Sequence, residues 1–228
     1  MGQPMTVREL LARLSEAVGA RGLSHWAAQC ARVCGLDGLF VSLRPGGELV
    51  WFSDDTSARL ADLQFTLGQG PEVGDTADAP LQVTDLAADD AGRWGRFAAE
   101  AAALDVRAVF VWPVRSGQVQ LGELTGYRRT PGPLSAGQSA AALRIADSLA
   151  DRLLAWRPDT DDPRDGPGTA GAIELHRAEV HQATGMLAAR YGISLDEALL
   201  RLRAHAFAGG RSLTDTARAL LHGPPPDT

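Results

Sequence analysis

The sequence contains no lysine. Its 22 basic residues are all arginine, and they face 28 Asp and Glu residues, which gives a formal net charge of -6. A protein that coats nucleic acid without sequence preference needs an excess of positive charge to neutralise phosphates, so this balance excludes that class. With 45% hydrophobic and 22% charged residues, the composition is that of a globular protein, and 228 residues allow one large domain or two small ones.

Cysteine and histidine are also scarce. Cys30 and Cys34 are four residues apart in "HWAAQCARVCGL", a spacing that places both on one face of a helix. Buried free thiols are the expected outcome, and we predict no disulfide and no zinc site. His25 is the only histidine before His176, so no haem ligand is available over most of the chain. We therefore expect no metal and no cofactor.

Long apolar runs are absent as well. No segment is long enough to span a bilayer, and "MGQPMTVRELLARLSEAV" is interrupted by charge too often for a signal peptide. We therefore expect a cytoplasmic protein without membrane segments. The sequence shows no Ser/His/Asp, Cys/His or paired-carboxylate set, and "GQGP" at 68–71 lacks the context of a phosphate loop. We do not expect an enzyme.

Proline and glycine are concentrated in one acidic stretch. "RPDTDDPRDGPGTAG", residues 157–171, has no apolar periodicity, so we predict a linker there. It separates residues 1–156 from a C-terminal unit at 172–223, which is followed by a short tail at 224–228. Residues 1–157 hold 15 Arg and 18 acids (net -3), whereas 172–223 hold 6 Arg and 5 acids (net +1). The C-terminal unit is therefore the less acidic part.

The N-terminal part mixes helical and strand patterns. Apolar spacing of three and four predicts helices at 6–18, 24–35, 93–105 and 135–156. Runs rich in Val, Phe and Trp predict a hairpin from 38–44 and 48–53, a strand at 79–86, and a second hairpin over 106–128 that turns at Ser116-Gly117. An antiparallel sheet with helices before and after it is an α+β domain.

Residues 20–155 resemble a GAF domain of the bacterial sensory type, through the order of these elements and the segments "FTLGQGPEV", "VTDL", "RWGRF" and "VRAVFVWPVR". The resemblance implies a GAF-type antiparallel sheet flanked by helices, with a small-molecule pocket over one face of the sheet. Trp51, Trp94 and Trp112 are candidates to line this pocket. The alternative is that they belong to the core, as large aromatic residues in strands often do.

The C-terminal unit is predicted to be an all-α bundle of three helices. The first ends at Gly192, the second begins with a capping box at Ser194 and Glu197 and ends at Gly209-Gly210, and the third starts near Ser212. Their apolar stripes are Val180, Ala183, Leu187 and Tyr191, then Leu195, Ala198, Leu199, Leu202 and Ala206, then Leu213, Ala217 and Leu220 or Leu221. A bundle with a core this small is expected to be only marginally stable unless it dimerises or docks on the N-terminal unit.

The segment "QATGMLAARYGISLDEALLRLRAHAF…RSLTDTARALL" resembles the ANTAR domain, a three-helix RNA-binding module of bacterial transcription antiterminators. The order GAF then ANTAR is similar to that of actinobacterial regulators. The resemblance implies that the surface around "ATGM" and nearby basic residues contact the loops of RNA hairpins. Carried over position by position, it points to Thr184, Gly185, Met186, Arg190, Arg203 and Arg211.

Two of these positions carry open alternatives. Many family members have lysine at Thr184, so this chain lacks a charge there, although a hydroxyl can still bond a base edge or a 2′-OH. Gly185 lies inside a predicted helix, where glycine costs about 1 kcal/mol relative to alanine. It serves either a close helix crossing or the approach of a nucleotide to exposed backbone. Each arginine considered singly is also compatible with an ordinary solvated face.

We therefore expect a signal-responsive regulator. A ligand of the GAF domain would change how two ANTAR bundles of a homodimer grip a paired-hairpin RNA and prevent a competing terminator from forming. Leu143, Ala146, Leu149 and Leu153 offer a dimer seam, or pack on the sheet instead. The alternatives are a protein–protein interaction module and a metabolite-binding GAF protein whose helical tail dimerises without binding RNA.

Overall fold

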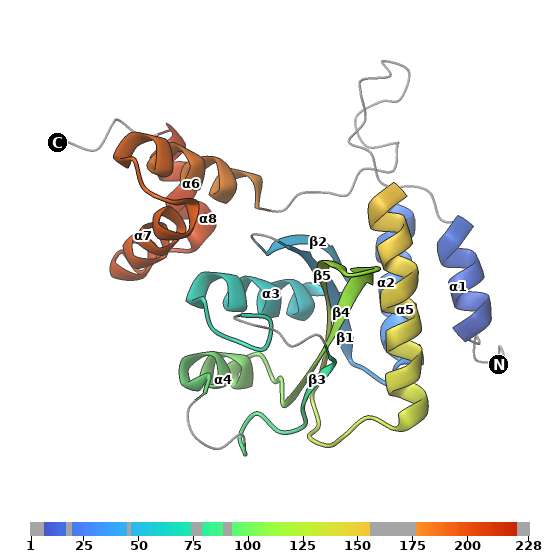
Figure 1. Ribbon diagram of the computed structural model, residues 1–228. Coiled ribbons are helices and arrows are strands. Elements are labelled where there is room, and N and C mark those ends of the chain that lie inside the picture. The colour runs from blue at the N-terminus through green and yellow to red at the C-terminus, as the bar shows by residue number, and fades with distance from the viewer. Residues whose placement is uncertain are drawn as a thin grey trace. The chain divides into compact units, whose positions relative to one another are not determined.

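The computed structural model describes residues 7–16, 20–44, 47–73, 79–88, 93–155 and 177–222 (Figure 1). The chain divides into two compact units, Met1–Glu174 and Leu175–Thr228. The predicted linker at 157–171 lies outside the described residues. No helix within the described stretches is long and apolar enough to cross a membrane.

The N-terminal unit is built on a five-stranded antiparallel sheet with strand order β2-β1-β5-β4-β3. The strands are β1 (Gly38–Leu43), β2 (Glu48–Phe52), β3 (Leu81–Val83), β4 (Ala108–Ser116) and β5 (Val119–Arg128). Both predicted hairpins are confirmed, since β1 pairs with β2 and β4 with β5. The pairing of β1 with β5 joins the two hairpins into one sheet.

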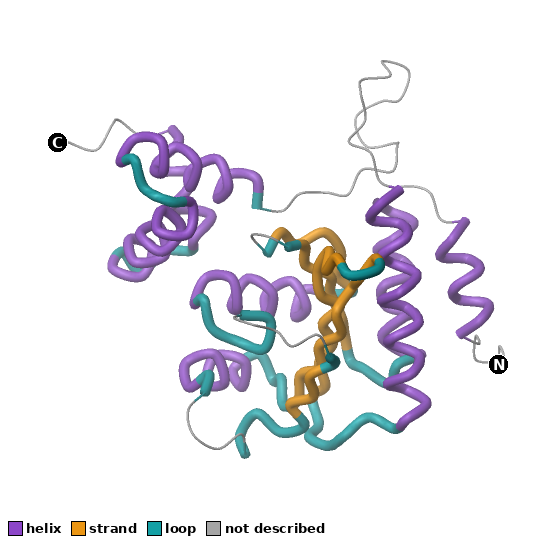
Figure 2. The backbone as a smooth tube through the Cα atoms, in the orientation of Figure 1, coloured by secondary structure: helices purple, strands orange, loops and turns teal. Residues whose placement is uncertain are grey.

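Helices cover both faces of this sheet (Figures 1 and 2). One face is covered by α2 (Ala20–Val33) and α5 (Ala136–Ala155), with α1 (Val7–Glu16) packed against both, and the other by α3 (Asp55–Leu67) and α4 (Gly95–Ala103). Successive residues of a strand point to opposite faces, so each face has its own core. In β1, Leu39 and Val41 belong to the α2/α5 side and Phe40 to the α3/α4 side.

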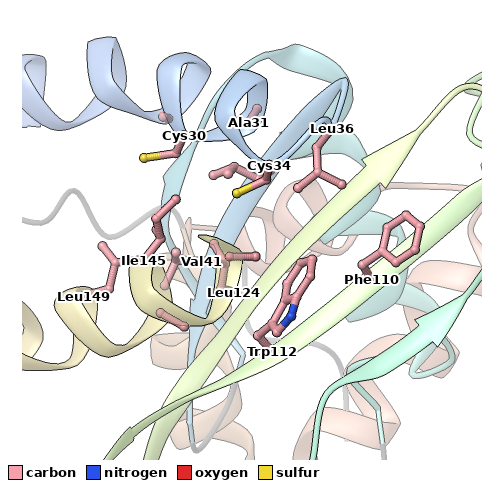
Figure 3. Packing of buried hydrophobic residues seen from close by; sticks show 14 of the residues in the cluster. Cys30, Ala31, Cys34, Leu36, Val41, Phe110, Trp112, Leu124, Ile145 and Leu149 are labelled. Atoms are coloured by element: carbon pink, nitrogen blue, oxygen red, sulfur yellow. The ribbon is translucent and has the colours of Figure 1, made fainter. Parts of the chain in front are cut away.

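Cys30 in α2 and Cys34, directly after the last residue of α2, are buried free thiols, as the sequence predicts. Figure 3 shows them opposite Ile145 and Leu149 of α5, with Trp112 rising from β4. Burial raises the pKa of both thiols, that of Cys34 to about 12. Both therefore stay protonated at neutral pH and have little nucleophilic character.

The apolar stripe of α5 is used inside the unit. Ala146 and Leu149 are buried against the sheet, and Leu153 is partly buried in the same core. Leu143 is the exposed member of the predicted dimer seam. The seam is therefore wrong for Ala146 and Leu149, because strands of the same chain cover them. The alternative, packing on the sheet, is confirmed.

Helix α3 departs from the expectations above, which place no element at 54–67. Its signals were nevertheless in the sequence. The Asp54 carboxylate accepts the N–H of Ser57 at 2.8 Å and caps the helix, and Gly68 ends it at φ 60°. Leu60, Ala61 and Phe65 form its buried side. The polar residues Ser57 and Gln64 also lie on the buried side, so the apolar period of this short helix is hard to recognise.

The C-terminal unit is the predicted bundle of three helices, α6 (Ala178–Tyr191), α7 (Leu195–Ala208) and α8 (Leu213–His222). The capping signals are confirmed: Gly192 ends α6 at φ 62°, and the Ser194 hydroxyl accepts the N–H of Glu197 at 3.1 Å. Ser212 caps α8 in the same way. The buried apolar side chains come from all three helices and are Val180, Ala183, Leu187, Ala198, Leu202, Ala206, Leu213 and Ala217.

Two residues of the predicted stripes are exposed, while Leu199, Leu220 and Leu221 are half-buried. Tyr191 is 50% exposed and Leu195 is 62% exposed. Tyr191 is the last residue of α6 and Leu195 the first of α7, so both flank the turn between these helices. At that end of the bundle, the apolar period continues past the point where neighbouring helices can cover it.

Candidate nucleic-acid interface

Charge on the described part of the bundle comes from six arginines and four acids. Arg177 is buried and Arg203 half-buried, which leaves Arg190, Arg201, Arg211 and Arg218 exposed. Two exposed arginines form ion pairs: Arg201 Nη2 lies 2.7 Å from Glu197 Oε1, and Arg218 Nε lies 3.1 Å from Glu179 Oε1. Exposed pairs of this kind contribute at most about 1 kcal/mol, so the side chains can exchange partners.

Thr184 lies in the core and not on the surface. Its side chain is 6% exposed, and its Oγ1 donates to the carbonyl oxygen of Val180 at 2.7 Å. A threonine inside a helix often bonds the carbonyl one turn earlier in this way. The expectation that this hydroxyl meets a base or a 2′-OH is therefore contradicted, because the side chain is buried and its proton is used within the helix.

Gly185 lies on the open side of α6. A Cβ built there would meet no atom within 4 Å beyond its chain neighbours and its own helix backbone. Two residues correspond to about 200° of rotation, so Gly185 points away from the core side that holds Ala183 and Leu187. The predicted close helix crossing is therefore wrong. The other interpretation, exposed backbone that a nucleotide can approach, has the space it needs.

The remaining four predicted residues are spread over the bundle. Met186 is half-buried, Arg190 is exposed on the last turn of α6, and Arg211 is exposed just before α8. Burial lowers the pKa of Arg203, the positive charge of Arg177 lowers it further, and Asp196 opposes this effect. Gly185 and Arg190 are separated by about 140° around their helix. The six predicted residues therefore do not form one continuous surface.

Arg211 contributes to a groove of about 490 Å³ at the junction of α7 and α8. The groove is lined by His205, Ala208, Gly209, Arg211, Thr216, Ala219 and Leu220. Small and apolar side chains combined with an imidazole and a guanidinium suit an unstacked base, which needs an apolar wall and hydrogen-bond donors at its edge. His205 was not singled out from the sequence, because nothing in its spacing distinguishes it from an ordinary exposed histidine.

Arginines from two helices meet at Tyr191. The Cζ atoms of Arg190 and Arg201 each lie 5.8 Å from the centre of its ring. Sequence reasoning missed this arrangement, since the stripe of α6 assigned Tyr191 to the core. The signal that could have found it is the position of Tyr191 directly before the helix-ending Gly192.

The three tryptophans of the N-terminal unit do not line one pocket. Trp51 and Trp112 lie in the α2/α5 core, and Trp94 lies in the α3/α4 core. The register explains this division: Trp51 pairs with Val41, Val41 with Leu124, and Leu124 with Trp112, so this row faces one side of the sheet. The prediction of a tryptophan-lined pocket is wrong, and the core alternative is confirmed.

The polar groups on the α3/α4 side are tied to a loop of the same chain. The hydroxyls of Ser42 and Thr125 both donate to the Glu72 carboxylate, that of Ser42 at 3.1 Å. The amide oxygen of Gln64 accepts the N–H of Glu72 at 3.0 Å. A Cβ at Gly70, which has φ 134°, would lie 2.5 Å from the same amide oxygen, so only glycine fits. The loop 68–73 is therefore fixed against the sheet.

Over the described ranges, no three or more His, Cys, Asp and Glu side chains gather in a way that could hold a metal ion.

Comparison with known proteins agrees with these two units. Residues 175–221 match the family described as "ANTAR domain". The GAF domain of an Acinetobacter phosphoenolpyruvate-protein phosphotransferase has a TM-score of 0.50 and 12% identity, over 68% of this chain and 95% of that chain. The GAF domain of a Coxiella burnetii phosphoenolpyruvate-protein phosphotransferase has a TM-score of 0.49 and 16% identity, over 68% of this chain and 96% of that chain. No match was found among curated proteins.

At such low identity the first of these structures shows the fold alone. The chain therefore combines an N-terminal unit of the GAF fold with a C-terminal segment, residues 175–221, that matches the ANTAR domain family.

Proposed function

We propose that this protein is a non-catalytic cytoplasmic regulator that binds hairpin RNA through its C-terminal bundle and thereby controls transcription termination. The unit with the GAF fold acts as the sensor, and a small molecule is its ligand. The observation that carries the proposal is the match of residues 175–221 to the ANTAR domain family. Four exposed arginines and the open backbone at Gly185 support it.

The charge balance limits the mode of binding. A net charge of -6 gives no long-range attraction to a polyanion, so affinity has to come from close contacts on the bundle. Proteins that bind RNA in this way recognise unpaired loop bases more than the regular duplex. A target of two paired hairpins, each held by one bundle of a homodimer, doubles the number of such contacts and raises the avidity.

The test is single-round transcription through a leader that encodes two hairpins, the second of which overlaps a terminator. We expect the wild-type protein to increase read-through. The double variant Arg190→Ala, Arg211→Ala removes two exposed charges of the bundle and is expected to lose most of this effect. Arg59→Ala removes an exposed arginine of α3 in the other unit and is the matched control. Unchanged read-through with the wild-type protein would contradict the proposal.

A protein-binding role is the second candidate. Leu200 and Phe207 of α7 are each 64% exposed, and seven residues correspond to two helical turns, so both lie on one face. Exposed apolar residues on one helix face are typical of a surface for another protein. The transcription assay separates the two candidates, because a module that binds only protein leaves read-through of the purified system unchanged.

A further inference from the structure

Tyr191 contributes little to the core of the bundle. Aromatic side chains are among the largest sources of buried apolar area, yet half of this one is exposed. Val180, Ala183 and Leu187, on the same helix, are buried. Tyr191 ends α6 and is followed by Gly192 at φ 62°, where the chain turns toward α7. The ring therefore stands at the end of the bundle with a surface that packing does not explain.

Two guanidinium groups accompany this ring. Arg190 precedes it on α6 and Arg201 comes from α7, and each Cζ lies 5.8 Å from the ring centre. This distance is near the outer limit of about 6 Å for a cation–π contact, so the ring is not tightly covered. Arg201 is oriented by its ion pair with Glu197, which engages Nη2. A guanidinium has five N–H donors, so this pair leaves donors for a further acceptor.

A flat aromatic surface beside two guanidinium groups matches the chemistry of a nucleotide. An unpaired base stacks on an aromatic ring, and phosphate oxygens accept charge-assisted hydrogen bonds from arginine. We propose that Tyr191 is the stacking platform for one unpaired base of the RNA loop, while Arg190 and Arg201 bind the adjoining phosphates. The inference rests on the proposed RNA binding and names the residue on which a loop base is held.

The proposed contact at Tyr191 strengthens binding without selecting a particular base. Stacking tolerates any base, because every base offers a π-face. Tyr191 therefore supplies affinity, and base choice falls to groups that reach base edges. Arg211 and His205 in the groove between α7 and α8 are such groups.

The experiment measures binding of the full-length protein to a fluorescent paired-hairpin RNA by anisotropy. A series of RNAs carries an abasic nucleotide at each loop position in turn. Tyr191→Phe keeps the ring, and Tyr191→Leu keeps apolar bulk without a ring. Phe207→Leu makes the same change at another exposed aromatic residue of the bundle and is the matched control. Thermal unfolding of each variant establishes that it is folded.

We expect Tyr191→Phe and Phe207→Leu to bind as the wild type does. Tyr191→Leu should bind about fivefold to a hundredfold more weakly, the loss that removal of one base–aromatic stack produces. One abasic RNA should weaken wild-type binding by the same factor and should make no further difference to Tyr191→Leu. This coupling separates a stacking contact from a structural role of the ring.

Two results would overturn the inference alone. A loss of affinity by the same factor on every RNA, abasic ones included, when Tyr191 is replaced by leucine would assign the ring to the fold. Wild-type affinity of Tyr191→Leu for the intact RNA would show that no base stacks there. Failure of the wild-type protein to bind any of the hairpin RNAs would instead overturn the proposed function together with this inference.

Discussion

At the scale of single residues, Gly185 is the most informative position of the bundle. It lies inside α6, and no neighbouring element occupies the space where a side chain would be. Glycine in a helix interior lowers stability relative to alanine, because the unfolded chain has more freedom to lose. A residue that weakens a helix without a packing reason is consistent with close approach of a ligand to the backbone.

Replacement of Gly185 by alanine should therefore raise the stability of the bundle and lower its affinity for RNA. We expect Gly185→Ala to raise the free energy of unfolding of the bundle by about 0.5–1 kcal/mol, measured by urea denaturation. The same variant should bind hairpin RNA more weakly, since a methyl group stands where the nucleotide approaches. A destabilised variant would show that the space beside Gly185 is occupied, and unchanged RNA affinity would show that no nucleotide lies there.

Residue positions around α6 could be predicted only in part. Val180, Ala183 and Leu187 were assigned to the core correctly, because apolar residues at spacings of three and four define one side of a helix. Thr184 was placed on the surface, although a threonine whose hydroxyl bonds its own helix is compatible with the core. Short side chains such as those around Gly185 leave the buried arc of a helix poorly defined.

At the scale of elements, the loop 68–73 is held by buried hydroxyls of two strands. Ser42 on β1 and Thr125 on β5 are both buried, and both donate to Glu72. A buried hydroxyl without an acceptor costs free energy, because it has given up its bonds to water. The carboxylate therefore ties the loop after α3 to the middle of the sheet.

Removal of this carboxylate should destabilise the N-terminal unit. We expect Glu72→Ala to lower its free energy of unfolding by about 1–3 kcal/mol, measured by urea denaturation followed through tryptophan fluorescence. Glu100→Ala removes an exposed carboxylate of α4 and should change stability by less than about 0.5 kcal/mol. Equal stability of the two variants would mean that the hydroxyls find other acceptors when Glu72 is absent.

Most elements and both hairpins could be predicted from the sequence, but the surface against which α5 packs could not. The hairpins followed from turn residues between runs of strand formers, and the helix ends of the bundle followed from Ser194, Ser212 and Gly192. The stripe of α5 gave no basis for choosing between the sheet and a second chain, since both offer an apolar surface. That choice depends on which apolar side chains the paired strands β4 and β5 present to α5. The sequence of α5 does not contain this information.

At the scale of the whole molecule, the chain pairs an acidic unit of the GAF fold with a C-terminal bundle that matches the ANTAR domain family and has four exposed arginines. Family resemblance predicted both units, and the comparisons confirm them. It placed Thr184 on the contact surface although that side chain is buried, because a family pattern aligns residue types and not their exposure. Arg190 and Arg201 lie near Tyr191 because α6 packs against α7. The sequence pattern alone does not predict this packing.

The most direct test of RNA recognition is anisotropy of the full-length protein with paired-hairpin RNA, a single hairpin and duplex DNA at several salt concentrations. We predict tightest binding to the paired hairpins and a logarithm of affinity that falls linearly with the logarithm of salt concentration. Arg190→Ala combined with Arg211→Ala should weaken binding and reduce that slope by about 1, because the phosphate contact of Arg190 is lost. Absence of binding, or equal affinity for duplex DNA, would contradict recognition of hairpin RNA by this bundle.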